Sequence, residues 1–116
     1  MGFMKCFDVV SMVVEEATSR FSPLWKVNKE KIEILNQYCD ILDILSKEFD
    51  GESYEVEVDE ITMEINIALE CEEIVITKKD HVFYDLIDRS VKYGFCVSDD
   101  GSLIIKFTFP SVWESI

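Results

Sequence analysis

Apolar residues near the start of the chain recur with the period of a helix. Within residues 3–21 they lie alternately four and three positions apart, at Phe3, Phe7, Val10, Val14, Ala17 and Phe21, which places them on one side of a helix. A run of β-branched valines within residues 9–14 leaves a strand as the alternative. We predict a helix, ended by Ser22–Pro23, and then a loop in which Trp25 covers an edge of the core.

Residues 28–50 have the clearest helical pattern in the chain. Asn28 is a typical N-cap, and Gly51 is suited to a left-handed stop after the helix. The apolar seam between them repeats in steps of three and four, as in a heptad pattern. We expect it to pack on the chain's own sheet. The alternative is a dimer seam that joins two copies of the chain through Leu35, Tyr38, Leu42 and Leu45.

After the second helix the period of the apolar residues changes to two, which is typical of strands with one buried face. A shift of phase at residues 59–60 fits a two-residue turn that pairs Val58 with Ile61. A second two-residue turn at residues 72–73 would pair Cys71 with Ile74 in the same way. We therefore predict a three-stranded antiparallel meander over residues 54–77. Neither turn offers glycine or asparagine for a positive φ, so a bulge or a longer loop is the alternative at either turn, and a helical turn is the alternative over residues 68–73.

The last part of the chain predicts a helix and a hairpin. The helix is expected over residues 80–93, with Asp80 as its cap and Gly94 after its end. A three-residue loop that ends in Gly101 then pairs Phe95 with Ile105. Residues 111–116 form a tail that folds back on the core through two apolar side chains, Val112 and Trp113.

These elements define an α+β fold. It has two N-terminal helices, a three-stranded antiparallel meander, a helix and a C-terminal β-hairpin, in the order α-α-β-β-β-α-β-β. The helices are expected to pack on one face of the antiparallel sheet. With 116 residues and a mass of 13.5 kDa, residues 1–116 should form a single domain.

The cysteines and the single histidine do not have the spacing of a metal site. Cys6, Cys39, Cys71 and Cys96 are widely separated, and His81 has no histidine or cysteine nearby. We expect buried, reduced thiols, no metal and no cofactor, in keeping with a cytoplasmic protein. The apolar start of the chain is interrupted by charges, so we expect no membrane segment.

The net charge of −13 is concentrated in the predicted meander. Residues 51–77 contain nine acidic side chains and no basic one. Such a balance disfavours direct binding of nucleic acid, which needs clustered lysine and arginine. The pairing of the meander turns its acidic residues outward or to its rim, and we take eight of them as candidate partner-binding residues: Glu55, Glu57, Asp59, Glu60, Glu64, Glu70, Glu72 and Glu73.

This acidic face suggests a non-enzymatic protein-binding module or inhibitor that docks on a basic surface of a partner protein. If that surface normally holds nucleic acid, the carboxylates would imitate phosphates, as acidic phage-type antagonists of defence nucleases do. The alternative is a solvated face that only keeps a sheet from aggregating.

A second hypothesis is a small acidic dimeric chaperone or adaptor. The predicted element order after Asn28 resembles that of type III secretion chaperones, which are small, acidic and usually dimeric. The resemblance is one of element order only, with no shared sequence motif.

A third hypothesis is of another class, a divalent-cation-binding domain or a small enzyme that uses the clustered carboxylates. Glutamates on a flat exposed face lack the enclosure that shifts a catalytic pKa. His81 and Asp85 are one helical turn apart, but a single histidine at a helix start is usually a surface residue or a neighbour of the cap. The Ser98–Gly101 segment lacks the further acidic residues of a calcium loop. An enzyme is therefore the less favoured class.

Overall fold

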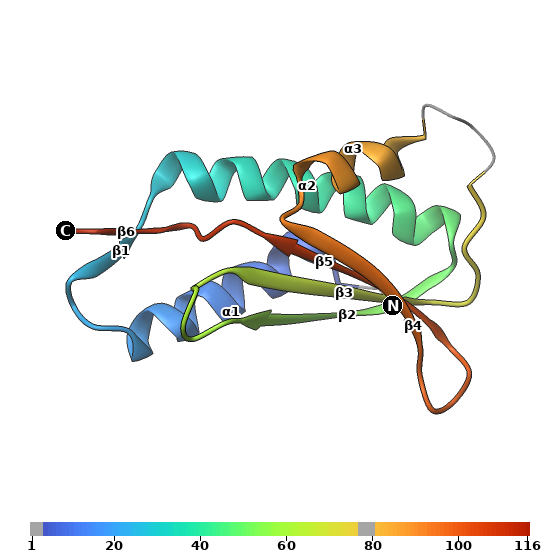
Figure 1. The fold of residues 1–116 in the computed structure, drawn as a ribbon, viewed down its shortest axis with the longest axis horizontal. Coiled ribbons are helices and arrows are strands. Elements are labelled where there is room, and N and C mark those ends of the chain that lie inside the picture. Colours follow the sequence, from blue (N-terminus) through green and yellow to red (C-terminus); the bar gives the residue numbers. More distant parts are fainter. Residues whose placement is uncertain (1–3, 77–80) are drawn as a thin grey trace.

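The computed structural model describes residues 4–76 and 81–116 and gives an α+β fold of helices packed on an antiparallel sheet (Figure 1). In chain order the elements are α1 (Cys6–Arg20), β1 (Trp25–Val27), α2 (Lys29–Glu48), β2 (Gly51–Val58), β3 (Ile65–Cys71), α3 (Val82–Arg89), β4 (Lys92–Val97), β5 (Leu103–Phe109) and β6 (Trp113–Ser115). The main sheet has the order β2-β3-β5-β4, and β1 pairs with β6 in a second, two-stranded sheet.

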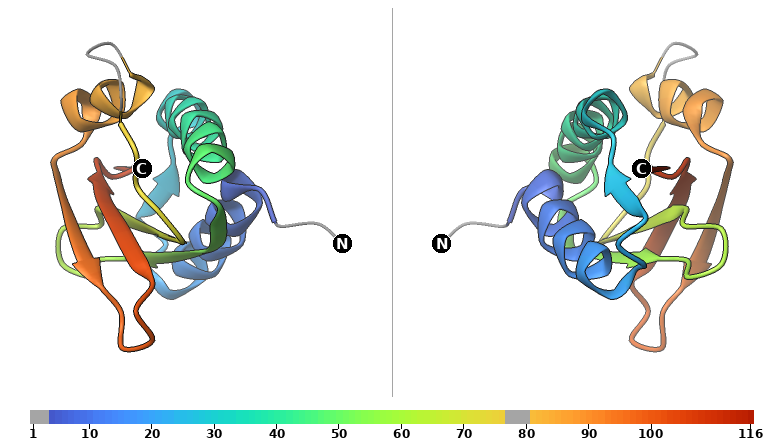
Figure 2. Two further views of the ribbon diagram at one scale, coloured as in Figure 1. Left: turned by 90° about the vertical axis from the view of Figure 1, so that its right-hand side faces the viewer. Right: turned by 90° about the vertical axis from the view of Figure 1, so that its left-hand side faces the viewer.

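The inner face of the main sheet is buried under the helices. On β3 every second residue, from Ile65 to Cys71, is completely buried. The same face continues on β5, where Ile105, Phe107 and Phe109 are completely buried. The two side views show α1 and α2 on the same side of the sheet, with α3 beside its β4 end (Figure 2). The prediction of helices over one face of an antiparallel sheet is confirmed.

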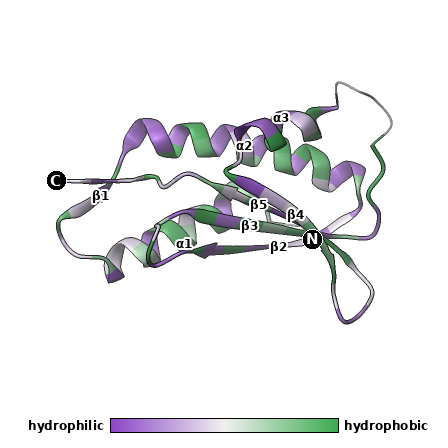
Figure 3. Ribbon diagram, viewed as in Figure 1, coloured by the Kyte–Doolittle hydropathy of each residue, from purple (hydrophilic) through white to green (hydrophobic). Residues whose placement is uncertain are grey.

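The two N-terminal helices form as the periodicity predicts. Val10, Val14 and Ala17 form the buried side of α1. The side chain of Asn28 accepts a hydrogen bond from the Lys31 backbone N–H at 3.0 Å, which confirms the N-cap of α2. Apolar and polar bands alternate along α2 (Figure 3), as expected of a helix with one buried side.

The heptad seam of α2 faces the chain's own sheet. Leu35, Leu42 and Leu45 are at most 2% exposed. The ring of Tyr38 stacks on Phe109 of β5 with 5.1 Å between centroids. Because the sheet already covers these side chains, they are not available as a dimer seam between two copies of the folded chain.

The predicted meander is wrong in its register and in its third strand. Val58 pairs with Ile65, four residues beyond the predicted partner Ile61. The residues that do pair keep the expected phase, because a shift of four residues preserves the alternation. Ile61, expected on the buried face, is instead 94% exposed in the loop. Residues 73–76 form no strand, and Thr77 lies outside the described residues. β3 pairs instead with β5 along its whole length.

The wider turn between β2 and β3 is built by Asp59. Its side chain accepts hydrogen bonds from the backbone N–H groups of Ile61 and Thr62, at 2.8 and 2.9 Å. The N–H of Met63 then donates to the Asp59 carbonyl, and Met63 takes a left-handed φ of 60°. An Asx turn with a left-handed residue closes a longer loop without the glycine or asparagine that a two-residue turn would need.

Gly51 has a different role from the predicted helix stop. Asp50 takes the left-handed φ, at 52°, and Gly51 is the first residue of β2. A Cβ at Gly51 would lie 2.9 Å from Ser46 Cβ and 3.1 Å from Leu69 Cδ1, and closer still to the Ser46 hydroxyl. The glycine is required there because β2 leaves α2 in close contact with it.

The third helix is shorter than predicted. It begins after His81, whose Nδ1 accepts a hydrogen bond from the Phe83 N–H at 3.1 Å, so His81 is the N-cap. The predicted cap Asp80 lies outside the described residues. The helix ends at Arg89, and the residues around Gly94, expected to follow a longer helix, form β4.

His81 also joins α3 to α2. With Nδ1 accepting, the neutral ring carries its hydrogen on Nε2, which lies 2.5 Å from a Glu48 carboxylate oxygen. The ring stacks on Phe49 at 6.1 Å between centroids. The histidine therefore fixes the start of one helix to the end of another, and its partner is Glu48 instead of Asp85.

The C-terminal hairpin is confirmed. Phe95 pairs with Ile105, and Gly101 takes a φ of 91° in the three-residue loop. However, Phe95 is 52% exposed and Cys96 is exposed, whereas the other three cysteines are buried as predicted. The difference arises because β4 is the edge strand of the sheet.

The two tryptophans lie in the two strands of the small sheet, and only one of them is buried. Trp25 is 39% exposed in β1, so the prediction that it covers the core edge is wrong. Trp113 is buried, and its indole N–H donates to the Thr18 hydroxyl at 2.9 Å. The pairing of β1 with β6 turns Trp113 inward and confirms that the tail folds back.

We predict that Gly51→Ala lowers the free energy of unfolding by about 1–3 kcal/mol, because the new methyl overpacks the contact with Ser46 and Leu69. Gly94→Ala is the control, since a Cβ there meets nothing within 4 Å; it should change that free energy by less than about 0.5 kcal/mol. Urea denaturation measures both, and equal losses would contradict the close-approach explanation.

We predict that His81→Ala lowers the free energy of unfolding by about 1–2 kcal/mol, because α3 loses its N-cap acceptor. His81→Asn restores a side-chain acceptor at the cap and should recover most of the loss. Thermal melts of the two variants beside the unchanged chain measure this, and an asparagine as harmful as alanine would show that the cap bond is unimportant.

Candidate functional site

The eight candidate acidic residues lie on the strand pair of β2 and β3 and at its two ends. Glu55 and Glu57 are exposed on the outer face of β2. Glu70 lies on the outer face of β3, opposite Ser53. The others occupy the two ends of this strand pair, in the loop after β2 and just after β3. We call the set the acidic stripe; its members are Glu55, Glu57, Asp59, Glu60, Glu64, Glu70, Glu72 and Glu73.

The outer face is not acidic throughout, a feature that the acidic segment of the sequence did not predict. The register places Lys106 of β5 two strands from Glu55, across Ala68, and Lys92 of β4 three strands from Glu57. One half of this face is therefore acidic and the other half basic. The alternation of the C-terminal hairpin already places both lysines on the face opposite its apolar residues. Only the pairing of β5 with β3 shows that this is the same face as that of the acidic residues.

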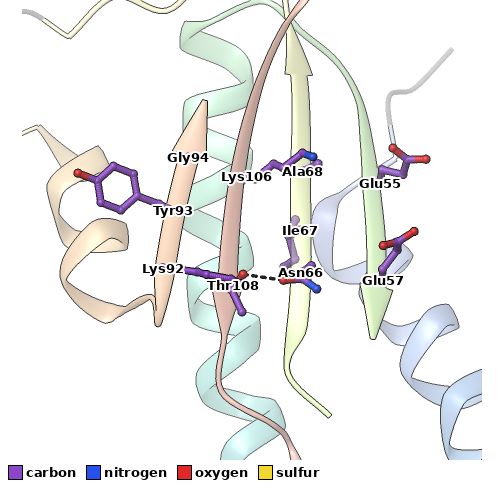
Figure 4. A pocket seen from close by; sticks show the side chains of 10 residues that line it. All are labelled: Glu55, Glu57, Asn66, Ile67, Ala68, Lys92, Tyr93, Gly94, Lys106 and Thr108. Carbon is purple, nitrogen blue, oxygen red and sulfur yellow. Dashed lines mark hydrogen bonds between the residues drawn. The ribbon is translucent and has the colours of Figure 1, made fainter. Parts of the chain in front are cut away.

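A shallow hollow of about 460 Å³ lies between the two charged halves (Figure 4). Its floor is made by small or short side chains, including Ala68 and Asn66, and by Gly94. The Thr108 hydroxyl donates to the Asn66 side-chain oxygen at 2.6 Å across the floor. The carboxylates of Glu55 and Glu57 stand on the β2 side of the hollow. The side chain of Lys106 reaches from β5 toward Ala68 of β3, and Lys92 lies on the β4 side (Figure 4).

Several members of the stripe have side-chain partners among the described residues, and Glu70 accepts a hydrogen bond from the Ser53 hydroxyl at 3.4 Å. Glu60 forms a 2.5 Å ion pair with Arg20 of α1. Asp59 holds the loop, and the backbone N–H groups of Thr62 and Ile61 lower the pKa of its carboxyl. These two residues thus have a structural role, whereas Glu55 and Glu57 form no ion pair with any residue in 4–76 or 81–116.

The other end of the stripe contains an acidic residue that the sequence analysis did not select. Glu52 lies beside Glu72, and a hydrogen bond between the two carboxyls raises the pKa of Glu52. The negative charges of Glu72, Glu70 and Asp100 add to the rise. Glu52 was overlooked because the strand was expected to begin at Tyr54, and it begins at Gly51.

A separate polar cluster behind the sheet is structural. One carboxylate oxygen of Asp43 accepts from the Cys6 backbone N–H at 3.0 Å and from the Tyr54 hydroxyl at 2.8 Å. Burial, and then the bond to Asp43, raise the pKa of Tyr54. A hydrogen bond to Cys39 raises the pKa of the Cys6 thiol. The hydrogen bonds to Asp43 anchor α1 and β2 to α2. The raised pKa values keep the thiol and the phenol neutral, so neither group is a ready nucleophile.

Among residues 4–76 and 81–116, no three histidine, cysteine, aspartate or glutamate side chains are arranged to share a metal ion. In the same part of the chain, no helix combines the length and the apolar character needed to cross a bilayer.

Comparisons with known proteins give no lead to a function. No family model, no curated protein and no solved structure matches the chain. The resemblance to type III secretion chaperones also loses its basis, because it relied on a third strand before the last helix, and residues 73–76 form none. The function is therefore inferred from the geometry of the outer face.

We predict that Glu72→Gln lowers the pKa of Glu52 toward its ordinary value of 4.5, because the hydrogen bond between the two carboxyls and the negative charge of Glu72 are both removed. Because the pKa of Glu52 is raised in the fold, its contribution to stability is present below about pH 4 and is lost as Glu52 ionises at higher pH. The variant should therefore have a higher melting temperature than the unchanged chain at neutral pH, but not below about pH 4. NMR titration of the Glu52 side chain and melts at both pH values test this. Glu15→Gln on α1 controls for net charge, and a Glu52 pKa that does not respond to Glu72 would contradict the pairing.

Proposed function

We propose that this protein is a non-enzymatic binding module that docks the acidic stripe on a basic surface of a partner protein. The observation that supports it most is the pair of exposed glutamates on β2, Glu55 and Glu57, which have no ion pair within the described residues. They lie in a segment of nine acidic and no basic residues. Such a surface attracts a basic partner over a distance and selects against an acidic one.

The two lysines on the same face define how the partner is oriented. A matching surface would be basic opposite β2 and neutral or acidic opposite Lys92 and Lys106. Like charges placed opposite each other across an interface are costly, so this polarity favours one orientation over its reverse. The hollow between the halves gives room for a protruding side chain of the partner.

Imitation of nucleic-acid phosphates is the specific form of this proposal. Residues two apart on a strand are separated by about 6.8 Å on the same face, so Glu55 and Glu57 present a row of negative charge along β2. A protein surface that binds phosphates with lysine and arginine would accept such a row. The partner would then be a nucleic-acid-binding protein, and this chain its inhibitor.

We predict that Glu55→Lys, Glu57→Lys and Glu64→Lys together abolish capture of the partner from lysate at low salt. The matched control reverses three exposed glutamates on the helices, Glu15, Glu30 and Glu33, and changes the net charge by the same amount. It should capture the partner like the unchanged chain. Mass spectrometry identifies the protein retained by the unchanged chain and the control but lost from the stripe variant.

Salt and DNA complete the test. Capture should weaken as salt increases, because exposed charges are screened over about 10 Å at 0.1 M. Duplex DNA should compete with this protein for the purified partner if phosphates are imitated. Equal capture by all three forms would show that the stripe only solubilises the sheet, whereas a lack of competition by DNA would reject the imitation alone.

A further inference from the structure

The β4 edge of the sheet exposes large apolar side chains that the proposed function does not use. Tyr93, Phe95 and Val97 are 49%, 52% and 67% exposed. They lie on the inner face of β4, which α3 covers only in part. Phe95 contacts Phe83 of α3 at 5.8 Å between ring centroids and is still about half exposed. Contiguous exposed apolar residues of this kind are typical of an interaction surface.

The two edges of the sheet differ in how they are protected. The β2 edge carries Glu52, Glu55 and Glu57. Charges on an edge strand hinder its pairing with another chain. The β4 edge has one charged residue, Lys92, and an apolar or small residue at each of its other five positions. The charges that should guard an edge are thus present on β2 and nearly absent from β4.

The hairpin determines which backbone groups of β4 point outward. The Ser98 N–H donates to the Ser102 carbonyl at 2.9 Å, so residues 98 and 102 form a hydrogen-bonded pair. Pairs alternate along an antiparallel ladder. Gly94 and Cys96 therefore bond to β5, and the N–H and C=O groups of Tyr93, Phe95 and Val97 point to the open edge.

We propose that a second copy of this chain pairs with the open edge of β4, antiparallel and about a twofold axis at Phe95, to form one continuous sheet through both copies. This register pairs Tyr93 with Val97 of the other copy and Phe95 with its counterpart. All three outward-pointing residues then exchange both backbone hydrogen bonds. In a register shifted by one residue, the backbone N–H and C=O groups that point to the open edge in one copy would lie opposite residues of the other copy whose groups already bond to β5.

The side chains and the charges suit this arrangement. The exposed apolar residues of one copy face those of the other on the inner face, and Gly94 faces Cys96 on the outer face. Lys92 of one copy would face Ser98 of the other, next to Asp100, whose carboxylate is held by the Ser98 hydroxyl and the Ser102 N–H. A parallel arrangement would instead place Lys92 beside Lys92 and Asp100 beside Asp100 of the other copy. The strand is therefore complementary to itself in its antiparallel orientation.

Mass measured by sedimentation in a reducing buffer tests the proposal. We expect twice the chain mass of 13.5 kDa at high protein concentration. Because each copy has a net charge of −13, added salt should strengthen the dimer. Salt should weaken partner capture by the stripe, so the two proposals fail independently.

A variant at the twofold axis locates the interface. Phe95→Lys opposes two ammonium groups and should give a monomer at concentrations where the unchanged chain is a dimer. Ile61→Lys replaces an apolar residue that is 94% exposed at the other edge and should leave the dimer intact. Circular dichroism checks that both variants fold.

A cross-link provides a measurement that does not depend on loss of association. Gly94→Cys has room for its side chain, since a Cβ there meets nothing within 4 Å. The new thiol should form a disulfide with Cys96 of the other copy when diamide oxidises the two thiols. The double variant Gly94→Cys with Cys96→Ser should not.

Three results would overturn the proposal. The first is that the unchanged chain remains a monomer at all concentrations and salt levels. This result overturns the proposal even if the β4 edge binds an extended segment of another protein. Another is a Phe95→Lys variant that is still a dimer. The third is a Gly94→Cys variant that is dimeric by mass but forms no disulfide with Cys96 of the other copy.

Discussion

Burial of the inner face of β3 is the constraint on which the rest of this structure depends. Its apolar side chains, from Ile65 to Cys71, are completely buried. Burial of that face requires a strand on each side and helices above it. β2 and β5 provide the strands, and the α2 seam provides much of the cover. The strength of this packing explains why the seam is used within the chain and not between copies.

This one-sided burial also decides where the charges go. With apolar residues on the inner face, the polar positions of all four strands are collected on the outer face. The acidic positions come from β2 and β3 and the basic ones from β4 and β5, so the outer face is divided in two. A chain with a large negative net charge thus has a basic region beside an acidic one, and the boundary between them is the hollow over Asn66 and Ala68.

The edges of the sheet differ for a related reason. β2 lies beside α1, and its outward-facing glutamates remain in water. β4 lies at the opposite edge, where the short helix α3 covers only part of its apolar face. One edge is therefore suited to docking by charge and the other to pairing by backbone and apolar contact, and the two modes respond in opposite ways to salt.

The sequence by itself determined the type of most elements and most of their buried residues, because both follow from local periodicity. Ile61 and Phe95 are exceptions, because one lies in a loop and the other on an edge strand. The α2 cap at Asn28 and the hairpin loop at Gly101 were equally local and were predicted correctly. The partner of β3 was decided only by the tertiary structure. A short third strand at residues 74–77 and the longer β5 both satisfied the alternation, and β5 is the partner because it pairs all seven residues of β3 and adds buried aromatic side chains. The same long-range choice joined Lys92 and Lys106 to the acidic strands in one sheet and left β4 at the edge, which no local pattern could show.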